Sequence, residues 1–131
     1  RMFAGCSSLT TLDVTSFNTS NVTNMNRMFD SMYALKSLDL SSFDTSNLEE
    51  AVSFLAYCNS LTELDFRNAT FSNVTDSTNM FQSAPSKIKV IVKDEEAKTF
   101  IQNKLGEGKG TIEIYTPPSE EGTTTESETT T

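Results

Sequence analysis

The hydrophobic positions of residues 2–79 recur at a fixed spacing, the one that separates Met2 from Met28. They divide this stretch into a first unit (residues 2–27), a second unit (28–53) and a third unit (54–79), and a fourth start at Met80 soon departs from the pattern. Five shared columns are Leu9/Leu35/Leu61, Leu12/Leu38/Leu64, Asp13/Asp39/Asp65, Val14/Leu40/Phe66 and Asn21/Asn47/Asn73. A unit of this size cannot bury its apolar side alone and must stack on its neighbours. The pattern therefore predicts a solenoid.

Two shorter periods within each unit predict a strand followed by a short helix. Leu12 and Val14 alternate with polar residues, which is typical of a strand with one buried face, and the later units repeat this alternation. Apolar residues from Val22 to Phe29 have helical spacing. The predicted N-caps are Ser20, Ser46 and Ser72. Asn, Ser and Thr give these helices a low intrinsic propensity, so packing must hold them.

One column departs from the repeat. Phe17 and Phe43 share a loop position that the third unit fills with Ala69, whereas a phenylalanine follows two residues later, at Phe71. We expect Phe71 to reach the same pocket through a local shift of the loop.

A different pattern begins at Pro85. Residues 87–92 (KIKVIV) and 111–115 (TIEIY) alternate as strands do, and residues 94–105 (DEEAKTFIQNKL) carry apolar residues at helical spacing. Asp94 is a suitable N-cap, and Gly106 follows the expected helix end. A solenoid needs a terminal unit that covers its open edge. We therefore expect three regions: a repeat array at 1–84, a β-α-β capping element at 85–116 and a disordered Thr/Glu-rich linker at 117–131, where no large apolar side chain is available for a core.

Charge and cysteine usage limit the possible partners and chemistry. The formal net charge of −8 argues against a nucleic acid or an anionic membrane surface as partner. No run of about 18 apolar residues is present, so we expect no membrane insertion in this segment. Cys6 and Cys58 occupy one column two units apart, roughly 10 Å, which exceeds the reach of a disulfide and predicts buried free thiols. The absence of histidine leaves a nucleophile without its usual base and a zinc site without its usual ligand, so we expect no enzyme, no metal and no cofactor.

The combined spacing of these motifs carries a resemblance. The pattern LxxLDLSxFDTSNVTxMxxMFxxC resembles the repeat of the BspA-like leucine-rich-repeat surface proteins, described as a bacterial surface protein 26-residue repeat domain, and it covers residues 2–79. The second unit departs with Met32 in place of cysteine, and the third with Phe54 in place of the methionine. Together with the predicted strands and the terminal element, the repeat predicts an α/β fold, a right-handed β/α leucine-rich-repeat solenoid with a C-terminal β-α-β cap. The resemblance implies a surface role. It also implies display on a bacterial cell surface and adhesion to host matrix or to other bacteria.

The outward columns of the predicted strands are the candidate site. They are Thr11, Asp13, Thr15, Ser37, Asp39, Ser41, Glu63, Asp65 and Arg67. Such an extended polar face is typical of binding surfaces on solenoids and could recognise a protein or a glycan. The aspartate column could instead bind calcium, which prefers six to eight oxygen ligands, or its carboxylates could be solvated or bonded to the backbone.

We therefore expect a non-catalytic cell-surface adhesion module that is monomeric and extracellular. Its partner would be a host matrix protein, a glycan or another bacterial surface component. The chain opens partway through a unit, so we expect a fragment whose export signal and anchor lie outside it. Two alternatives remain open: a passive structural spacer within a larger surface protein, and a calcium-dependent module. The first would leave the outward columns without a ligand, whereas the second would use the aspartate column.

Overall fold

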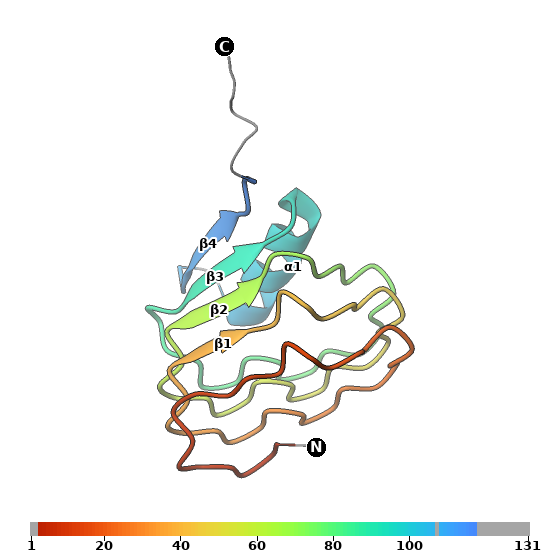
Figure 1. Cartoon of the computed structure of the whole chain (residues 1–131). Helices are drawn as coiled ribbons and strands as arrows, with labels where there is room; N and C mark the ends of the chain where they lie inside the picture. Colours follow the sequence, from red (N-terminus) through yellow and green to blue (C-terminus); the bar gives the residue numbers. More distant parts are fainter. Residues whose placement is uncertain (1–2, 107, 118–131) are drawn as a thin grey trace.

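The computed structural model describes residues 3–106 and 108–117 of the chain. Along this part of the chain lie strands β1 (Ser37–Asp39), β2 (Glu63–Phe66) and β3 (Lys89–Val92), helix α1 (Glu95–Leu105) and strand β4 (Thr111–Ile114). The strands form one sheet in the order β1-β2-β3-β4, and all three neighbouring pairs are parallel (Figure 1). The predicted mixed α/β class is confirmed. The predicted linker at 117–131 lies outside the described residues, except for Pro117.

The register of the sheet follows the period of the sequence. Ser37 pairs with Glu63, and Glu63 pairs with Lys89, so each step from β1 to β3 equals the length of one unit. The last step is shorter, because Lys89 pairs with Thr111 across the connection that contains α1. Strand β3 therefore continues the spacing of the units, although the sequence places it after the repeat has ended.

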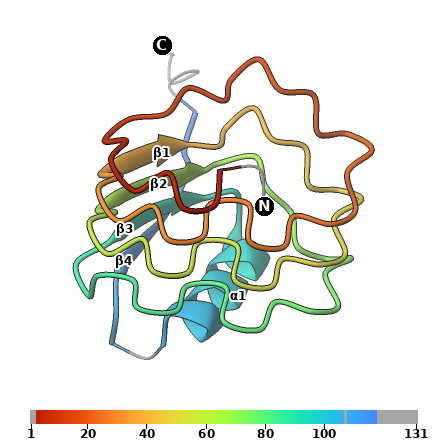
Figure 2. The same ribbon diagram turned by 90° about the horizontal axis from the view of Figure 1, so that it is seen from below.

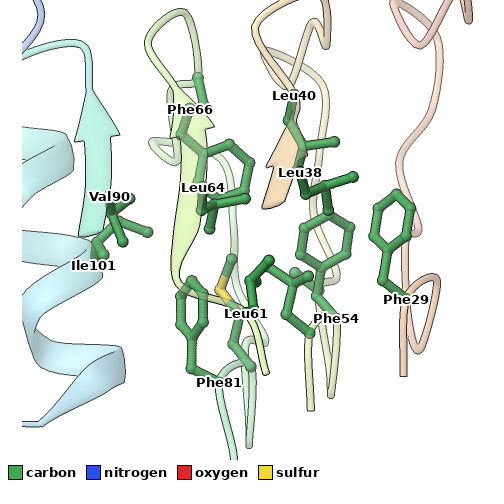
Figure 3. Packing of buried hydrophobic residues seen from close by; sticks show 14 of the residues in the cluster. Phe29, Leu38, Leu40, Phe54, Leu61, Leu64, Phe66, Phe81, Val90 and Ile101 are labelled. Carbon is green, nitrogen blue, oxygen red and sulfur yellow. The ribbon is translucent and has the colours of Figure 1, made fainter. Parts of the chain in front are cut away.

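The buried side of the sheet supplies one wall of the hydrophobic core. Leu38, Leu64 and Val90 are register partners and are buried, as are Leu40 and Phe66 at the ends of β1 and β2 (Figure 3). Helix α1 packs its own apolar side against this core through Ala97, Ile101 and Leu105. Its first turn is capped as predicted, because Asp94 Oδ1 accepts the backbone N–H of Ala97 at 2.9 Å.

The short helices predicted within the units are absent from the described part of the chain. Backbone N–H groups instead donate to carbonyls of the following unit, as from Phe29 to Phe54 (3.0 Å), from Ser31 to Ala56 (2.7 Å) and from Leu55 to Met80 (2.8 Å). The units consequently lie side by side as irregular turns of similar shape (Figure 2). The helical spacing of the apolar residues correctly predicted that they are buried, but it wrongly predicted a helical backbone.

Residues with positive φ explain why no helix forms there. They occupy two columns of the repeat: Arg27 (59°), Ser53 (54°) and Asn79 (58°) in one, and Gly5 (78°), Ser31 (65°), Tyr57 (62°) and Ser83 (65°) in the other. An α-helix needs φ near −63° at every residue, so a left-handed residue ends it. The predicted cap Ser46 has another role, since its hydroxyl donates to Asp44 Oδ1 at 2.6 Å.

The first unit is covered less completely than the others. Leu9 is 38% exposed, whereas Leu35 and Leu61 in the same column are at most 1% exposed. The strand predicted around Leu12 and Val14 is also absent, although Lys36 N–H donates to the Thr10 carbonyl at 3.2 Å. Both differences have one cause, because within the part of the chain that the structure describes the first unit contacts a neighbouring unit on one side only.

In one column of the repeat, the third unit contacts α1 where the first and second units contact the following unit. The Thr19 hydroxyl donates to the Asp44 carbonyl and the Thr45 hydroxyl to the Thr70 carbonyl, each reaching into the following unit. Phe71 occupies the next position of this column, and its ring stacks on Phe100 of α1 with centroids 4.5 Å apart. Phe71 therefore faces the helix, which differs from the pocket expected from the sequence.

Candidate functional site

The solvent-facing side of the sheet gathers several of the predicted site residues. Ser37 and Glu63 are register partners, as are Asp39 and Asp65, and the buried leucines between them place these four side chains on the opposite face. They line a groove of about 300 Å³, together with Lys89 and Ile91 of β3. Ser41 and Arg67 follow the ends of β1 and β2.

The first-unit members of the predicted set are placed less regularly. Thr11, Asp13 and Thr15 are all exposed, but they belong to no strand and do not line the groove. The chain here runs beside β1 (Figure 2). These residues therefore lie at the edge of the predicted face, beside β1 and outside the groove.

Each aspartate of the Asp13/Asp39/Asp65 column closes a turn within its own unit. Asp13 Oδ1 accepts the backbone N–H of Thr15 at 3.0 Å, Asp39 Oδ1 that of Ser41 at 2.9 Å, and Asp65 Oδ1 that of Arg67 at 3.0 Å. This is the backbone-bonded alternative considered from the sequence. Each carboxylate consequently presents less of its hydrogen-bonding capacity to a ligand than a free aspartate would.

These hydrogen bonds favour the charged form of the carboxylates. The hydroxyl and backbone N–H of Thr15 hold the pKa of Asp13 below its usual value of 3.8, and those of Ser41 do the same for Asp39. The groove thus carries negative charge at neutral pH. Within residues 3–106 and 108–117, no group of three or more His, Cys, Asp or Glu side chains is arranged to hold a metal ion.

Glu63 and Arg67 differ in whether their side chains interact with other residues of the protein. Arg67 binds Asp65 through Nε and Nη2, at 3.0 and 2.6 Å from Oδ2, and its guanidinium lies 4.2 Å from the ring centroid of Tyr115. It therefore joins the third unit to the segment after β4. The exposed side chain of Glu63, by contrast, forms no hydrogen bond or ion pair with any residue that the structure describes. Glu63 is the acidic group of the groove that remains available to a partner.

The sequence-based prediction missed Lys89 and Ile91, which complete the groove. Both were assigned to the terminal element, yet they lie one unit length after Glu63 and Asp65 and pair with them in the sheet. Extending the period beyond the third unit would have identified them. Lys89 Nζ also lies 3.7 Å from Glu113 Oε1 on β4, an exposed pair that places a positive charge beside the acidic residues.

The cysteines lie away from this face. Both are free, as predicted; Cys58 is buried, whereas Cys6 is only half-buried because it belongs to the less covered first unit. Burial raises the pKa of the Cys58 thiol to about 11, and its Sγ lies 3.1 Å from the Phe29 carbonyl, to which the thiol donates. A thiol of this kind is unreactive at neutral pH and serves as core.

Comparison with known proteins places the chain in a family. No helix among the described residues has the length and apolar character needed to cross a membrane. No curated protein and no solved structure matches the chain. A family model described as "Mycoplasma protein of unknown function, DUF285" matches residues 1–93, which include the three units, β1, β2 and β3. The chain belongs to this DUF285 family.

Proposed function

We propose that the solvent-facing side of the sheet is a non-catalytic interaction surface that binds a protein or a glycan. The observation that carries this proposal is the groove of about 300 Å³ along β1, β2 and β3, lined by Ser37, Asp39, Glu63, Asp65, Lys89 and Ile91. A groove lined by polar groups together with one apolar side chain can form hydrogen bonds and also bury part of a partner. Its position on consecutive strands suits an extended ligand.

The finer architecture supports this proposal. We infer a right-handed β/α leucine-rich-repeat solenoid, with the array at 1–84 and a β-α-β cap at 85–116. The register steps of one unit length and the hydrogen bonds between successive units support the array, and the stacking of Phe71 on Phe100 supports the cap. Solenoids commonly bind partners across several units at once.

The family supports a proposal about the cellular setting. DUF285 is associated with BspA-like surface repeat proteins, and the motifs of the three units resemble those proteins. We therefore propose an extracellular adhesion module on a bacterial surface. Its candidate partners are a host matrix protein, a glycan or a component of another bacterial surface.

Glu63 offers the sharpest test of the binding surface. The variant Glu63→Lys reverses a charge in the groove without removing any described hydrogen bond or ion pair, so it should leave the fold intact. Glu49→Lys is a matched control, because Glu49 is also exposed but lies in an irregular part of the second unit, outside the groove. Asp39 is less suitable because its replacement by lysine would remove the oxygen that accepts the Ser41 N–H and would open a turn.

The measurement is saturable binding of the native chain and both variants to immobilised matrix proteins, mucin-type glycans and bacterial surface extracts. We expect binding to one class, weakened by Glu63→Lys and unchanged by Glu49→Lys. Equal binding by all three proteins would show that the groove is not the site. The absence of binding across the panel would favour the passive spacer, and a requirement for added calcium would favour the calcium-dependent module.

A further inference from the structure

The groove on the sheet contains two carboxylates that no cation of the described residues balances. Its charged lining residues are Asp39, Glu63, Asp65 and Lys89. Asp65 is paired with Arg67, and Lys89 is paired with Glu113. Asp39 and Glu63 form no ion pair with any residue that the structure describes. The groove therefore carries two uncompensated negative charges.

The groove lies in the interior of the sheet, away from either end of the array. Strand β1 pairs with β2 on one side, and on the other side the N–H of Lys36, the residue before β1, donates to the Thr10 carbonyl of the first unit at 3.2 Å. Strand β2 lies between β1 and β3, and β3 lies between β2 and β4 (Figure 1). Each strand that lines the groove thus has a described neighbour on both sides, and the exposure of the groove is a property of the sheet face itself.

Asp39 and Glu63 are spaced so that one planar cation can reach both. Glu63 is the register partner of Ser37, and Asp39 lies two residues further along β1 on the same face. A strand separation of about 4.8 Å and a rise of about 3.3 Å per residue put their Cα atoms about 8 Å apart. A guanidinium carries five N–H donors in a planar fork, so it can donate to two carboxylates at once, whereas an ammonium is a more compact group. The spacing therefore favours arginine over lysine.

The third unit already binds a guanidinium to an aspartate of the same column. Arg67 donates to Asp65 Oδ2 from Nε at 3.0 Å and from Nη2 at 2.6 Å. The equivalent residue after Asp39 is Ser41, and its N–H and hydroxyl are the only described donors to Asp39. Asp39 thus occupies the same strand position as Asp65 but has no arginine of its own. An arginine from a partner could take the place that Arg67 takes at Asp65.

The rest of the groove suits a protein segment better than a glycan. Ile91, the register partner of Asp65, is half-buried and offers an apolar contact beside the acidic residues. Leu38 and Leu64 line the groove, although their side chains are buried on the other side of the sheet. A glycan that carries carboxylate or sulfate groups would be repelled by the two free carboxylates, and a neutral glycan would leave their charge unbalanced.

We propose that the groove binds an extended protein segment through an arginine side chain, whose guanidinium bridges Asp39 and Glu63 while a neighbouring apolar residue packs on Ile91. This inference rests on the proposed function of the groove as an interaction surface, and it specifies the chemistry of the partner. The formal charge of −8 on the whole chain also attracts a basic partner from solution.

The test is an NMR titration of the isotope-labelled full chain with a capped peptide of sequence Gly-Val-Arg-Val-Gly. A second peptide with citrulline in place of arginine keeps the shape of the side chain and removes its charge. We expect saturable shifts of the amide signals of β1 and β2 with the arginine peptide. The citrulline peptide should bind at least about tenfold more weakly, because it forms neither of the two ion pairs.

Three variants of the chain locate the binding site. Glu63→Gln removes one charge of the groove and should weaken binding of the arginine peptide about fivefold, as expected for one solvent-exposed ion pair. Ser41→Arg supplies the second unit with the arginine that the third unit already has, so it should also weaken binding by competing for Asp39. Glu49→Gln is the matched control, because Glu49 is exposed but lies outside the groove, and it should leave binding unchanged.

Several results would overturn the proposal. They are equal affinity for the arginine and citrulline peptides, the same affinity of Glu63→Gln and the native chain for the arginine peptide, and the absence of saturable shifts in β1 and β2. Competition separates this failure from failure of the proposed function. A panel component whose binding is weakened by Glu63→Lys but is not displaced by the arginine peptide would keep the groove as the interaction surface and reject arginine as its ligand.

Discussion

Short polar side chains fix the corners of each unit. In the first unit, Asp13, Asn18 and Asn24 each accept the backbone N–H of the residue two positions later, at 3.0, 3.1 and 2.8 Å. Asp39 and Asp44 repeat the first two of these turns in the second unit. Such side-chain to backbone bonds compete with helix formation. The many Asn, Asp, Ser and Thr side chains therefore determine the conformation of the irregular turns through these hydrogen bonds.

The carboxylates in these turns predict how stability depends on pH. Donation from the hydroxyl and backbone N–H two residues later lowers the pKa of Asp13, Asp39, Asp44 and Asp76 below 3.8. The pKa is therefore lower in the folded than in the unfolded chain, so this stabilisation is complete above the unfolded value and is lost as the pH falls through the folded values. We expect the free energy of unfolding, measured by urea titration, to decrease as the pH is lowered below about 4.

A variant with all four aspartates changed to asparagine gives the control. Asparagine keeps the accepting oxygen, as Asn18 and Asn24 already show in this chain, but it does not titrate in this range. The dependence on pH should therefore become shallower while the fold remains. An unchanged dependence would mean that other carboxylates control acid unfolding.

At the scale of elements, the strands and the helix were predictable where the sequence pattern specifies both burial and backbone conformation. The alternation around Leu38, Leu64 and Val90 identified β1, β2 and β3, and an acidic N-cap before an amphipathic stretch identified α1. The expected helices within the units failed because their spacing fixes which residues are buried, not the backbone angles. Nothing in an Arg27 or a Tyr57 indicates a positive φ before the structure is known.

The candidate site was predictable to a similar extent. Period-two alternation placed Ser37, Asp39, Glu63 and Asp65 on one exposed face. It could not show that the aspartates close their own turns, because that depends on side-chain geometry two residues away. The extent of the groove was also hidden, since β3 departs from the sequence motif while keeping the register.

The connection from α1 to β4 offers a test at the scale of elements. Gly108 and Gly110 have nearly equal positive φ values, 79° and 78°. A Cβ at Gly110 would lie 3.0 Å from Leu105 Cδ1 and 3.2 Å from the Ile88 carbonyl oxygen, whereas a Cβ at Gly108 would meet nothing within 4 Å. Alanine at either position should cost about 1 kcal/mol for the backbone conformation. At Gly110 it should cost about 1–3 kcal/mol more for crowding.

Chemical denaturation of the two alanine variants measures this difference directly. The pair is its own control, because the substitution is the same and the φ values are nearly equal at both positions. Equal losses of stability would contradict the close packing of β4 against the end of α1 and the start of β3.

At the scale of the whole molecule, stability should rise from the first unit toward the sheet formed by β2 and β3. Units that contact only their neighbours share stability unequally, and a terminal unit has one interface where an inner unit has two. The exposure of Leu9, compared with Leu35 and Leu61, has the same cause. The amides that join the units provide a measure of this gradient.

Hydrogen exchange under native conditions should resolve it. We expect the amides of Phe3 and Gly5, which donate to the second unit, to exchange faster than those of Phe29 and Ser31, which donate to the third. Uniform protection across these amides would instead indicate that the units open together as one cooperative body.

The column Thr19, Thr45, Phe71 has a consequence for how the length of this protein can change. A threonine at this position reaches forward to hold the next unit, whereas Phe71 holds a helix. An extra unit inserted before the third could accept a hydrogen bond from the Thr45 hydroxyl. A threonine at the same position of the inserted unit could then donate to the unit that follows it. The same unit inserted after the third would meet an aromatic ring. Phe71 therefore allows further units to be added before the third unit and prevents their addition after it.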